Sequence, residues 1–252
     1  MKSHLSLAFS LLLLASCASA QLYSGEQRAV IQPKATGYPY LMFVPKHNVP
    51  RDRGQPLLIF LHGSGERGSD IALVKIHGPP KLVQTRPDFP FVTVSPQLEA
   101  GGDWDVAKLD AMLTQVRRKV RIDAGRIYLT GLSRGGHATW RWAAERPALF
   151  AAVAPIAGRG DAAQACALKD LPVWAFHGEK DYVVTPEGSS EMAKAINACG
   201  GSARLTIYSD TGHDSWTRTY DDPALYAWLL AQSKRPVSHT RRSTMKSHQR
   251  QR

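Results

Sequence analysis

The sequence predicts an α/β fold in which helices cover both faces of a doubly wound, mostly parallel sheet. Short apolar runs such as Leu57–Leu61 are typical of strands that are buried on both sides. Amphipathic segments alternate with these runs, and Asp105–Val120 carries its apolar residues at helical spacing. An apolar fraction of 43% over 252 residues is enough for a full hydrophobic core.

The first half of the chain supplies three expected strands and one helix. Tyr38–Pro45 alternates as a strand does, and it is followed by two continuous apolar runs, Leu57–Leu61 and Phe91–Ser95. Asp105–Val120 then repeats its apolar side chains every three to four residues, which predicts a helix with one buried face.

The second half continues the alternation. The expected strands are Arg126–Gly131, Ala151–Gly158, Val173–Gly178 and Ala203–Ser209, and the expected helices are Gly135–Glu145, Glu187–Ala198 and Pro223–Gln232. Pro147 ends the first of these helices, because proline cannot continue a helix from its interior. No repeat or linker interrupts the pattern, so we expect one domain over residues 21–233, with little or no cap domain.

The N-terminus has the pattern of a secretory signal peptide. Lys2 precedes an apolar run, Leu5–Leu14, that is too short to span a bilayer. Two processing sites stay open: cleavage after residue 20, before Gln21, or a bacterial lipobox over residues 14–17 that would lipidate Cys17 and anchor the protein to a membrane. Both predict export from the cytoplasm, to a periplasmic, secreted or lipid-anchored location at the cell envelope.

The net charge of +11 belongs mostly to the C-terminal tail, residues 234–252, which carries seven basic residues and no acidic one. Without those seven and Lys2, the rest of the chain has a net charge of only +3. The tail has few apolar residues and is expected to be disordered. The charge therefore predicts no nucleic-acid partner, although a polyanion-binding arm stays open as an alternative.

Three cysteines are present, and Cys166 and Cys199 are the two that follow the signal segment. In an exported protein this number permits one disulfide. Two separate thiols are an equally open alternative, because spacing along the chain does not establish proximity.

The strongest chemical motif runs from Gly131 to Gly135 and fits G-x-S-x-G between an expected strand and an expected helix. A serine on such a sharp turn takes strained backbone angles, and neighbouring side chains would collide with the backbone. The turn exposes the hydroxyl at a helix N-terminus, which favours developing negative charge. Ser133 is therefore the predicted nucleophile.

A serine hydroxyl needs a base, and the base needs an acid to orient it. His213 follows the last expected strand and Asp181 follows the preceding one. The chain order Ser133, Asp181, His213 is that of α/β-hydrolases. The competing acids are Glu179, Asp210 and Asp214, of which Glu179 is the closest rival.

Two other histidines, His62 and His177, each stand in a His-Gly pair at a strand end. We expect both to pack under the site and to bond loop backbone rather than to serve as the base.

The glycine-rich loop after Leu57–Leu61 is the expected source of a second oxyanion donor. One donor is the backbone N–H of Arg134, and the other is the N–H of Ser64, with Gly65 as the next choice. In the same loop, Glu66 and Arg67 are expected to form a structural ion pair.

This loop also spells G-x-G-x-x-G, from Gly63 to Gly68, which is the dinucleotide-binding fingerprint. The helix onset after it is poor. The candidate ribose-binding acid, Asp88, lies in a loop broken by prolines. The oxyanion role is therefore favoured, and no cofactor or metal is expected.

These motifs resemble the secreted bacterial α/β-hydrolases labelled predicted peptidases or phospholipase/carboxylesterase-like esterases, which are relatives of prolyl oligopeptidase catalytic domains and feruloyl esterases. The resemblance spans roughly residues 37–232 and rests on "PLLIFLHGSGERG", "RIYLTGLSRGGHATW", "LPVWAFHGEKDYVV" and "GHDSWTRTY". It implies the same three catalytic residues. Arg134 departs from the methionine common in these relatives, and whether its cation faces the pocket or solvent stays open.

The sequence predicts a serine carboxylic ester hydrolase that acts through an acyl-enzyme on small or polysaccharide-linked esters. The residues expected to line its pocket are Gln97, Trp104 and Trp216, with a core position as the alternative for the tryptophans. A peptidase of the prolyl oligopeptidase type is the alternative enzyme. A non-catalytic envelope protein that binds polyanions through its tail is the alternative of another class.

Overall fold

The structure is a computed structural model that describes residues 25–31, 37–46 and 54–234. The expected signal peptide with Cys17 lies outside the described residues, as does the basic tail beyond Lys234. Within the described ranges, no helix is both long and apolar enough to cross a membrane.

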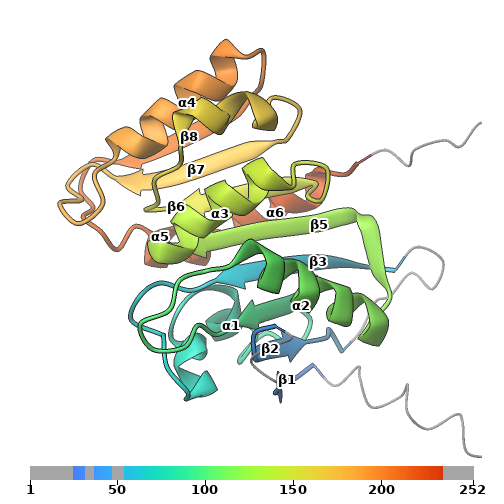
Figure 1. The fold of residues 1–252 in the computed structure, drawn as a ribbon. Coiled ribbons are helices and arrows are strands. Elements are labelled where there is room, and N and C mark those ends of the chain that lie inside the picture. The colour runs from blue at the N-terminus through green and yellow to red at the C-terminus, as the bar shows by residue number, and fades with distance from the viewer. Residues whose placement is uncertain (1–24, 32–36, 47–53, 235–252) are drawn as a thin grey trace, which may run out of the picture.

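Strands and helices alternate along the chain (Figure 1). The strands are β1 (Gln27–Val30), β2 (Tyr40–Phe43), β3 (Gln55–Leu61), β4 (Val92–Pro96), β5 (Ile122–Leu132), β6 (Ala152–Ile156), β7 (Val173–Gly178) and β8 (Ala203–Tyr208). The α-helices are α1 (Gly78–Leu82), α2 (Val106–Lys119), α3 (Arg134–Glu145), α4 (Glu187–Ala198), α5 (Trp216–Asp221) and α6 (Pro223–Ala231). Two 3-10 helices, η3 (Ile71–Ile76) and η4 (Ala162–Leu168), complete the described elements.

The described strands form one sheet in the order β1-β2-β4-β3-β5-β6-β7-β8. β2 pairs antiparallel with both β1 and β4, and every pair from β4 to β8 is parallel. The chain order reverses beside β3, so the loops after β3 and β5 leave the same edge of the sheet together. This arrangement confirms the predicted mostly parallel sheet and places the functional loops at its carboxyl edge.

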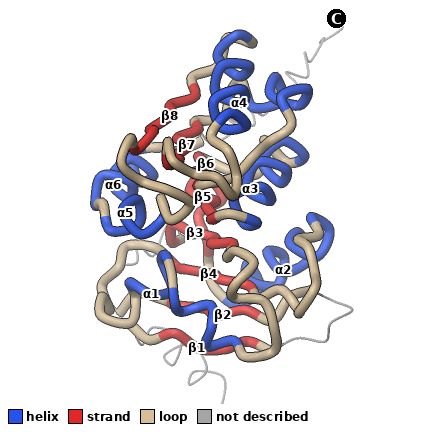
Figure 2. The backbone as a smooth tube through the Cα atoms, turned by 90° about the vertical axis from the view of Figure 1, so that its left-hand side faces the viewer, coloured by secondary structure: helices blue, strands red, loops and turns tan. Residues whose placement is uncertain are grey.

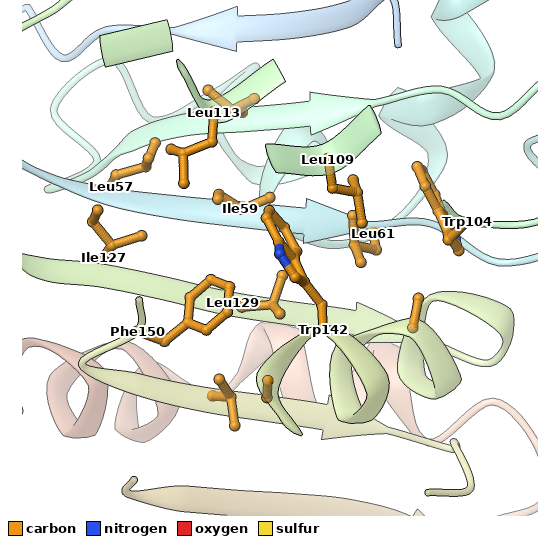
Figure 3. Close-up of a cluster of buried hydrophobic side chains, with 14 of the residues drawn as sticks. Leu57, Ile59, Leu61, Trp104, Leu109, Leu113, Ile127, Leu129, Trp142 and Phe150 are labelled. Atoms are coloured by element: carbon orange, nitrogen blue, oxygen red, sulfur yellow. The ribbon is translucent and has the colours of Figure 1, made fainter. Parts of the chain in front are cut away.

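Helices lie on both faces of the sheet, as predicted. Figure 2 shows α2, α3 and α4 on one side and α1, α5 and α6 on the other. Each side buries its own apolar cluster. Figure 3 shows part of the first, in which Leu109 and Leu113 of α2 and Trp142 of α3 lie over β3 and β5. Apolar burial on both faces explains why the central strands read as continuous apolar runs.

The sequence pattern did not predict β1, α1 or α5. α1 has five residues and α5 has six, which is less than two helical turns and too short for a helical period to register. β1 has four residues, none of them fully buried, so it lacks the apolar run that marked the other strands. β5 also begins earlier than expected, at Ile122, because it extends to pair with the start of β3.

A disulfide joins Cys166 in η4 to Cys199 at the end of α4, with the two Cα atoms 5.3 Å apart. The pairing closes a loop between residues that are 33 positions apart. Both cysteines belong to elements that pack on the side of the sheet that carries α3 and α4.

Replacing both Cys166 and Cys199 by alanine should lower the melting temperature by about 10 °C. Releasing a loop of this length from the unfolded chain removes about 3 to 4 kcal/mol of stability, and each kcal/mol corresponds to about 2–4 °C in a domain of this size. Differential scanning calorimetry of the double variant, with the wild type before and after reduction, measures the change. An unchanged melting temperature in the double variant would contradict a stabilising disulfide.

Candidate active site

The turn from β5 into α3 carries Ser133 in a strained conformation. Its φ is 51° and its ψ is −116°, a region that residues other than glycine rarely occupy. A methyl group on Gly135 would collide with the carbonyl oxygen of Leu61, and one on Gly131 would collide with the Gly135 carbonyl. The two glycines therefore allow the serine turn to pack tightly against the end of β3.

Ser133, His213 and Asp181 are hydrogen-bonded in series. The Nε2 atom of His213 lies 3.0 Å from the Ser133 hydroxyl oxygen. Its Nδ1 atom lies 2.7 Å from Oδ2 of Asp181. The three side chains follow β5, β8 and β7 respectively, so adjacent or nearby parallel strands bring them to one edge of the sheet. The histidine retains 21% of its side-chain exposure, which leaves it accessible to a small substrate.

The carboxylate of Asp181 is buried and fully provided with donors. Its Oδ1 atom accepts the backbone N–H groups of Val183 and Val184, each at 2.9 Å. Burial alone would raise the pKa of Asp181, but the hydrogen bonds from His213, Val184 and Val183 together hold it below its ordinary value.

The competing acids lie elsewhere. Glu179 is exposed and Asp210 forms an ion pair with Arg218. Asp214 accepts the N–H of Thr217 in the first turn of α5. Of the four acids considered from the sequence, Asp181 alone contacts His213 among the described residues.

Both additional histidines are buried under the site, as predicted. The Nε2 atom of His62 accepts the Leu98 N–H at 3.0 Å, and its Nδ1 atom bonds the Gly63 carbonyl at 2.7 Å. His177 contacts Oδ2 of Asp181, the same oxygen that His213 contacts. Neither ring reaches Ser133.

The glycine-rich loop lies directly against the serine turn. A Cβ atom built on Gly63 would be 3.5 Å from the Cβ of Ser133. Ser64 and Gly65 are exposed at the tip of the loop, and within the described chain their backbone N–H groups have no backbone acceptor. The first N–H groups of α3, beginning at Arg134, are likewise without intrahelical acceptors. These N–H groups can therefore receive a negatively charged oxygen.

The side chain of Arg134 links the start of α3 to the glycine-rich loop. Its Nε atom donates to the Ser64 hydroxyl at 2.9 Å, and one terminal nitrogen lies 3.4 Å from the Asp103 carboxylate. The cation thus spans the loop rather than pointing freely into solvent.

No α-helix begins directly after Gly68. The next described element is the 3-10 helix Ile71–Ile76, capped by Asp70. A dinucleotide fold would need an α-helix there, whose N-terminus faces the pyrophosphate. The G-x-G-x-x-G motif of this chain therefore lacks the helix that a nucleotide-binding motif requires.

The expected ion pair between Glu66 and Arg67 was wrong. The Glu66 carboxylate lies 3.7 Å from His62 and 3.6 Å from His77, whereas Arg67 donates to the Ser64 carbonyl. Burial raises the pKa of Glu66, but the two histidines outweigh it and lower the value overall. Sequence reasoning missed His77, because its partner is eleven residues away in a different turn.

Two of the three expected pocket residues have structural positions. Trp104 lies in the core (Figure 3) and is 2% exposed. It packs edge-on against His62. Gln97 is also 2% exposed, and its amide donates to the carbonyls of Glu66 and Asp70. Both side chains support the glycine-rich loop. Trp104 takes the core position that was its alternative, whereas Gln97 also lines a cavity of about 470 Å³. Contact of either side chain with substrate stays a prediction.

The third expected pocket residue, Trp216, is half-buried. Its ring lies at 90° to that of His213, with centroids 5.0 Å apart. Its contact with substrate stays a prediction.

A cavity of about 270 Å³ runs along the face of α3 that begins at Arg134. His137 and Arg141 line it from the next two turns of the helix, and Arg159 lines it from the loop after β6. Sequence reasoning did not single out His137 or Arg159, because spacing along the chain does not show which side chains face a cavity. A second cavity, of about 470 Å³, is lined by the loops that hold Gly68 and Gln97.

Residues 95–235 match the family model described as "Dienelactone hydrolase family". A "Putative carboxymethylenebutenolidase" from Salmonella typhimurium is 32% identical over 100 residues, which cover 36% of this chain and 37% of that protein. The "Putative esterase NocK" of Nocardia uniformis subsp. tsuyamanensis is 29% identical over 164 residues, which cover 58% of this chain and 46% of that protein. The chain therefore spans less than half the length of the curated relatives that it matches.

A solved structure described as "Crystal Structure of a Thermostable Esterase" has a TM-score of 0.71 and 34% sequence identity. The match covers 82% of this chain and 63% of that one. It shares the mostly parallel sheet with helices on both faces, which confirms the predicted superfamily. The family model spans more than half of the 252 residues. The chain therefore belongs to the dienelactone hydrolase family of α/β-hydrolases.

Proposed function

We propose that this hydrolase cleaves carboxylic esters through a serine acyl-enzyme. The observation that carries the proposal is the series of hydrogen bonds from Asp181 through His213 to Ser133. Membership of an ester-hydrolysing family and likeness to an esterase support the same reaction. No metal or cofactor is required by these steps.

In the proposed reaction, Nε2 of His213 removes the hydroxyl proton as Oγ of Ser133 attacks the ester carbonyl carbon. Asp181 accepts the Nδ1–H of His213, which keeps Nε2 free to take the proton and stabilises the imidazolium that forms. The imidazolium then gives that proton to the departing alcohol oxygen. A water molecule repeats both steps on the acyl-enzyme and releases the acid.

The carbonyl oxygen becomes negatively charged in the tetrahedral intermediate. We assign its stabilisation to the backbone N–H of Arg134 and to the Ser64 N–H, with Gly65 beside it. Such donors act strongly because they are fixed before the charge develops. The side-chain hydrogen bond between Arg134 and Ser64 supports this role, since it links the two residues that carry the donors.

Small or polymer-linked acyl esters are the proposed substrates. β6 ends at Ile156 and β7 begins at Val173, so the connection between them holds η4 and no room for a lid domain. This short connection supports a substrate with a bulky alcohol group, and the cavity that begins at Arg134, the residue after Ser133, offers volume for a short acyl or alcohol fragment.

We also propose that the protein works outside the cytoplasm. The apolar N-terminal run is the pattern of an export signal. The Cys166–Cys199 disulfide is a bond that persists in oxidising compartments.

A substrate panel tests the proposed function. Purified protein should hydrolyse p-nitrophenyl acetate and acetylated or feruloylated oligosaccharides much faster than peptide p-nitroanilides. A fluorophosphonate probe should label the peptide that contains Ser133, as read by mass spectrometry. Faster cleavage of anilides would indicate a peptidase, and no turnover or labelling at all would favour a binding protein.

A further inference from the structure

His177 is a second histidine on the carboxylate of Asp181, which the proposed mechanism leaves unused. It is the fifth residue of β7 and is 0% exposed. A buried polar ring must find a partner for each nitrogen, so the identity of those partners determines which nitrogens carry a proton.

The Nε2 side of the ring faces two oxygen acceptors. Oδ2 of Asp181 lies 3.1 Å from Nε2, and the carbonyl oxygen of Val184 lies 2.8 Å from it. Neither atom can donate a hydrogen bond. Nε2 must therefore carry a proton.

The Nδ1 side faces the hydroxyl of Ser189, 2.8 Å away. That hydroxyl oxygen is also 2.8 Å from the carbonyl oxygen of Gly158, which can only accept. A hydroxyl has one proton to give. If Ser189 gave it to Nδ1, two oxygen lone pairs would face each other at hydrogen-bond distance in a buried site. If it gives the proton to Gly158, every atom is satisfied, and Nδ1 must donate to Ser189.

We infer that His177 is a buried imidazolium that donates from both nitrogens and holds Asp181 through a charge-assisted hydrogen bond. It is a positioning residue, because it touches the acid and not the reacting atoms. The cost of burying one charge is offset by the opposite charge 3.1 Å away. The consequence for catalysis rests on the proposed role of Asp181; the protonation state does not.

The charged and titratable groups around this ring are few. Asp181 and His213 lie on one side, Glu187 stands at the exposed start of α4, and the side chain of Arg159 packs against Gly188. A fixed cation beside Asp181 reduces the negative potential that His213 experiences. The charge of His177 therefore acts on the base through the carboxylate oxygen that both histidines contact.

Nitrogen NMR of histidine-labelled wild-type protein at pH 7 tests the protonation state without reference to activity. Both ring nitrogens of His177 should show the shifts of protonated nitrogen. His62 serves as the internal contrast, since one of its nitrogens accepts the Leu98 N–H and must be bare. The variant His177→Gln identifies the His177 signals, because they disappear from its spectrum. If His177→Gln does not fold, Ser189→Ala identifies the same signals, because the loss of the hydroxyl shifts them. A neutral pattern for His177 would overturn the inference.

The pH dependence of kcat/KM tests the consequence. Glutamine can still donate to Asp181 but carries no charge, so His177→Gln should move the acidic limb about one unit to higher pH. The rate on the plateau should change far less than the rate at the limb. An unmoved limb would contradict the tuning role. Absence of ester turnover in the wild type would instead defeat the proposed function, while the NMR result would still decide the charge.

Discussion

Ser133→Ala is expected to lower kcat/KM for p-nitrophenyl acetate by about 10⁵-fold or more, leaving only the residual effect of the oxyanion donors. The variant removes the atom that forms the acyl-enzyme, and no other described hydroxyl contacts His213. Its melting temperature should be unchanged or higher, because alanine removes one polar atom without creating a cavity. Stopped assays with active-site titration measure the residual rate.

A matched control is Ser202→Ala. Ser202 is exposed immediately before β8, at the opposite edge of the sheet from the site. Its loss should leave turnover within twofold of the wild type. If both serine variants were equally active, the acyl-enzyme mechanism would be wrong.

Asp181→Asn is expected to lower kcat by about 10⁴-fold, close to the effect of the same change in other serine triads. The carboxylate of Asp181 accepts four hydrogen bonds, from His213, His177 and the N–H groups of Val183 and Val184. An asparagine has the same shape, but its NH₂ group would face one of these donors. If it faces His213, it favours the tautomer in which Nε2 carries the proton and cannot act as the base. Glu179→Gln should change kcat by less than threefold, because Glu179 is exposed and does not contact the base. Steady-state kinetics of the pair settle the acid, and a larger loss for Glu179→Gln would reverse the assignment.

The acid also links stability to pH. Because hydrogen bonds hold the folded-state pKa of Asp181 below its unfolded value, its contribution to stability is present above the unfolded pKa. That contribution is lost as the pH falls through the folded pKa. Asp181→Asn should therefore weaken the pH dependence of the melting temperature in acid.

The order of elements and the three catalytic candidates could be predicted because each has a local cause. Buried parallel strands leave apolar runs, and a strained serine turn needs glycine at fixed offsets. The strand order and the loop positions then bring Ser133, Asp181 and His213 together without further information.

Side-chain placement could not be predicted in the same way. Trp104 and Gln97 follow a strand at the functional edge, as pocket residues do, yet both turn inward to support the loop. Glu66 pairs with His77 rather than with its neighbour in sequence. These outcomes depend on packing between distant segments, which residue type and spacing do not encode.

The three proposed catalytic residues lie far apart in the sequence, and this separation has a consequence for folding. Ser133 meets a histidine 80 residues later, and that histidine meets an acid 32 residues earlier. Both contacts need β5, β7 and β8 to be paired in the sheet, because each of the three residues follows one of these strands. A nascent or partly folded chain therefore has no competent base beside its serine. The proposed ester hydrolysis is therefore expected only once β8, the last described strand, has joined the sheet.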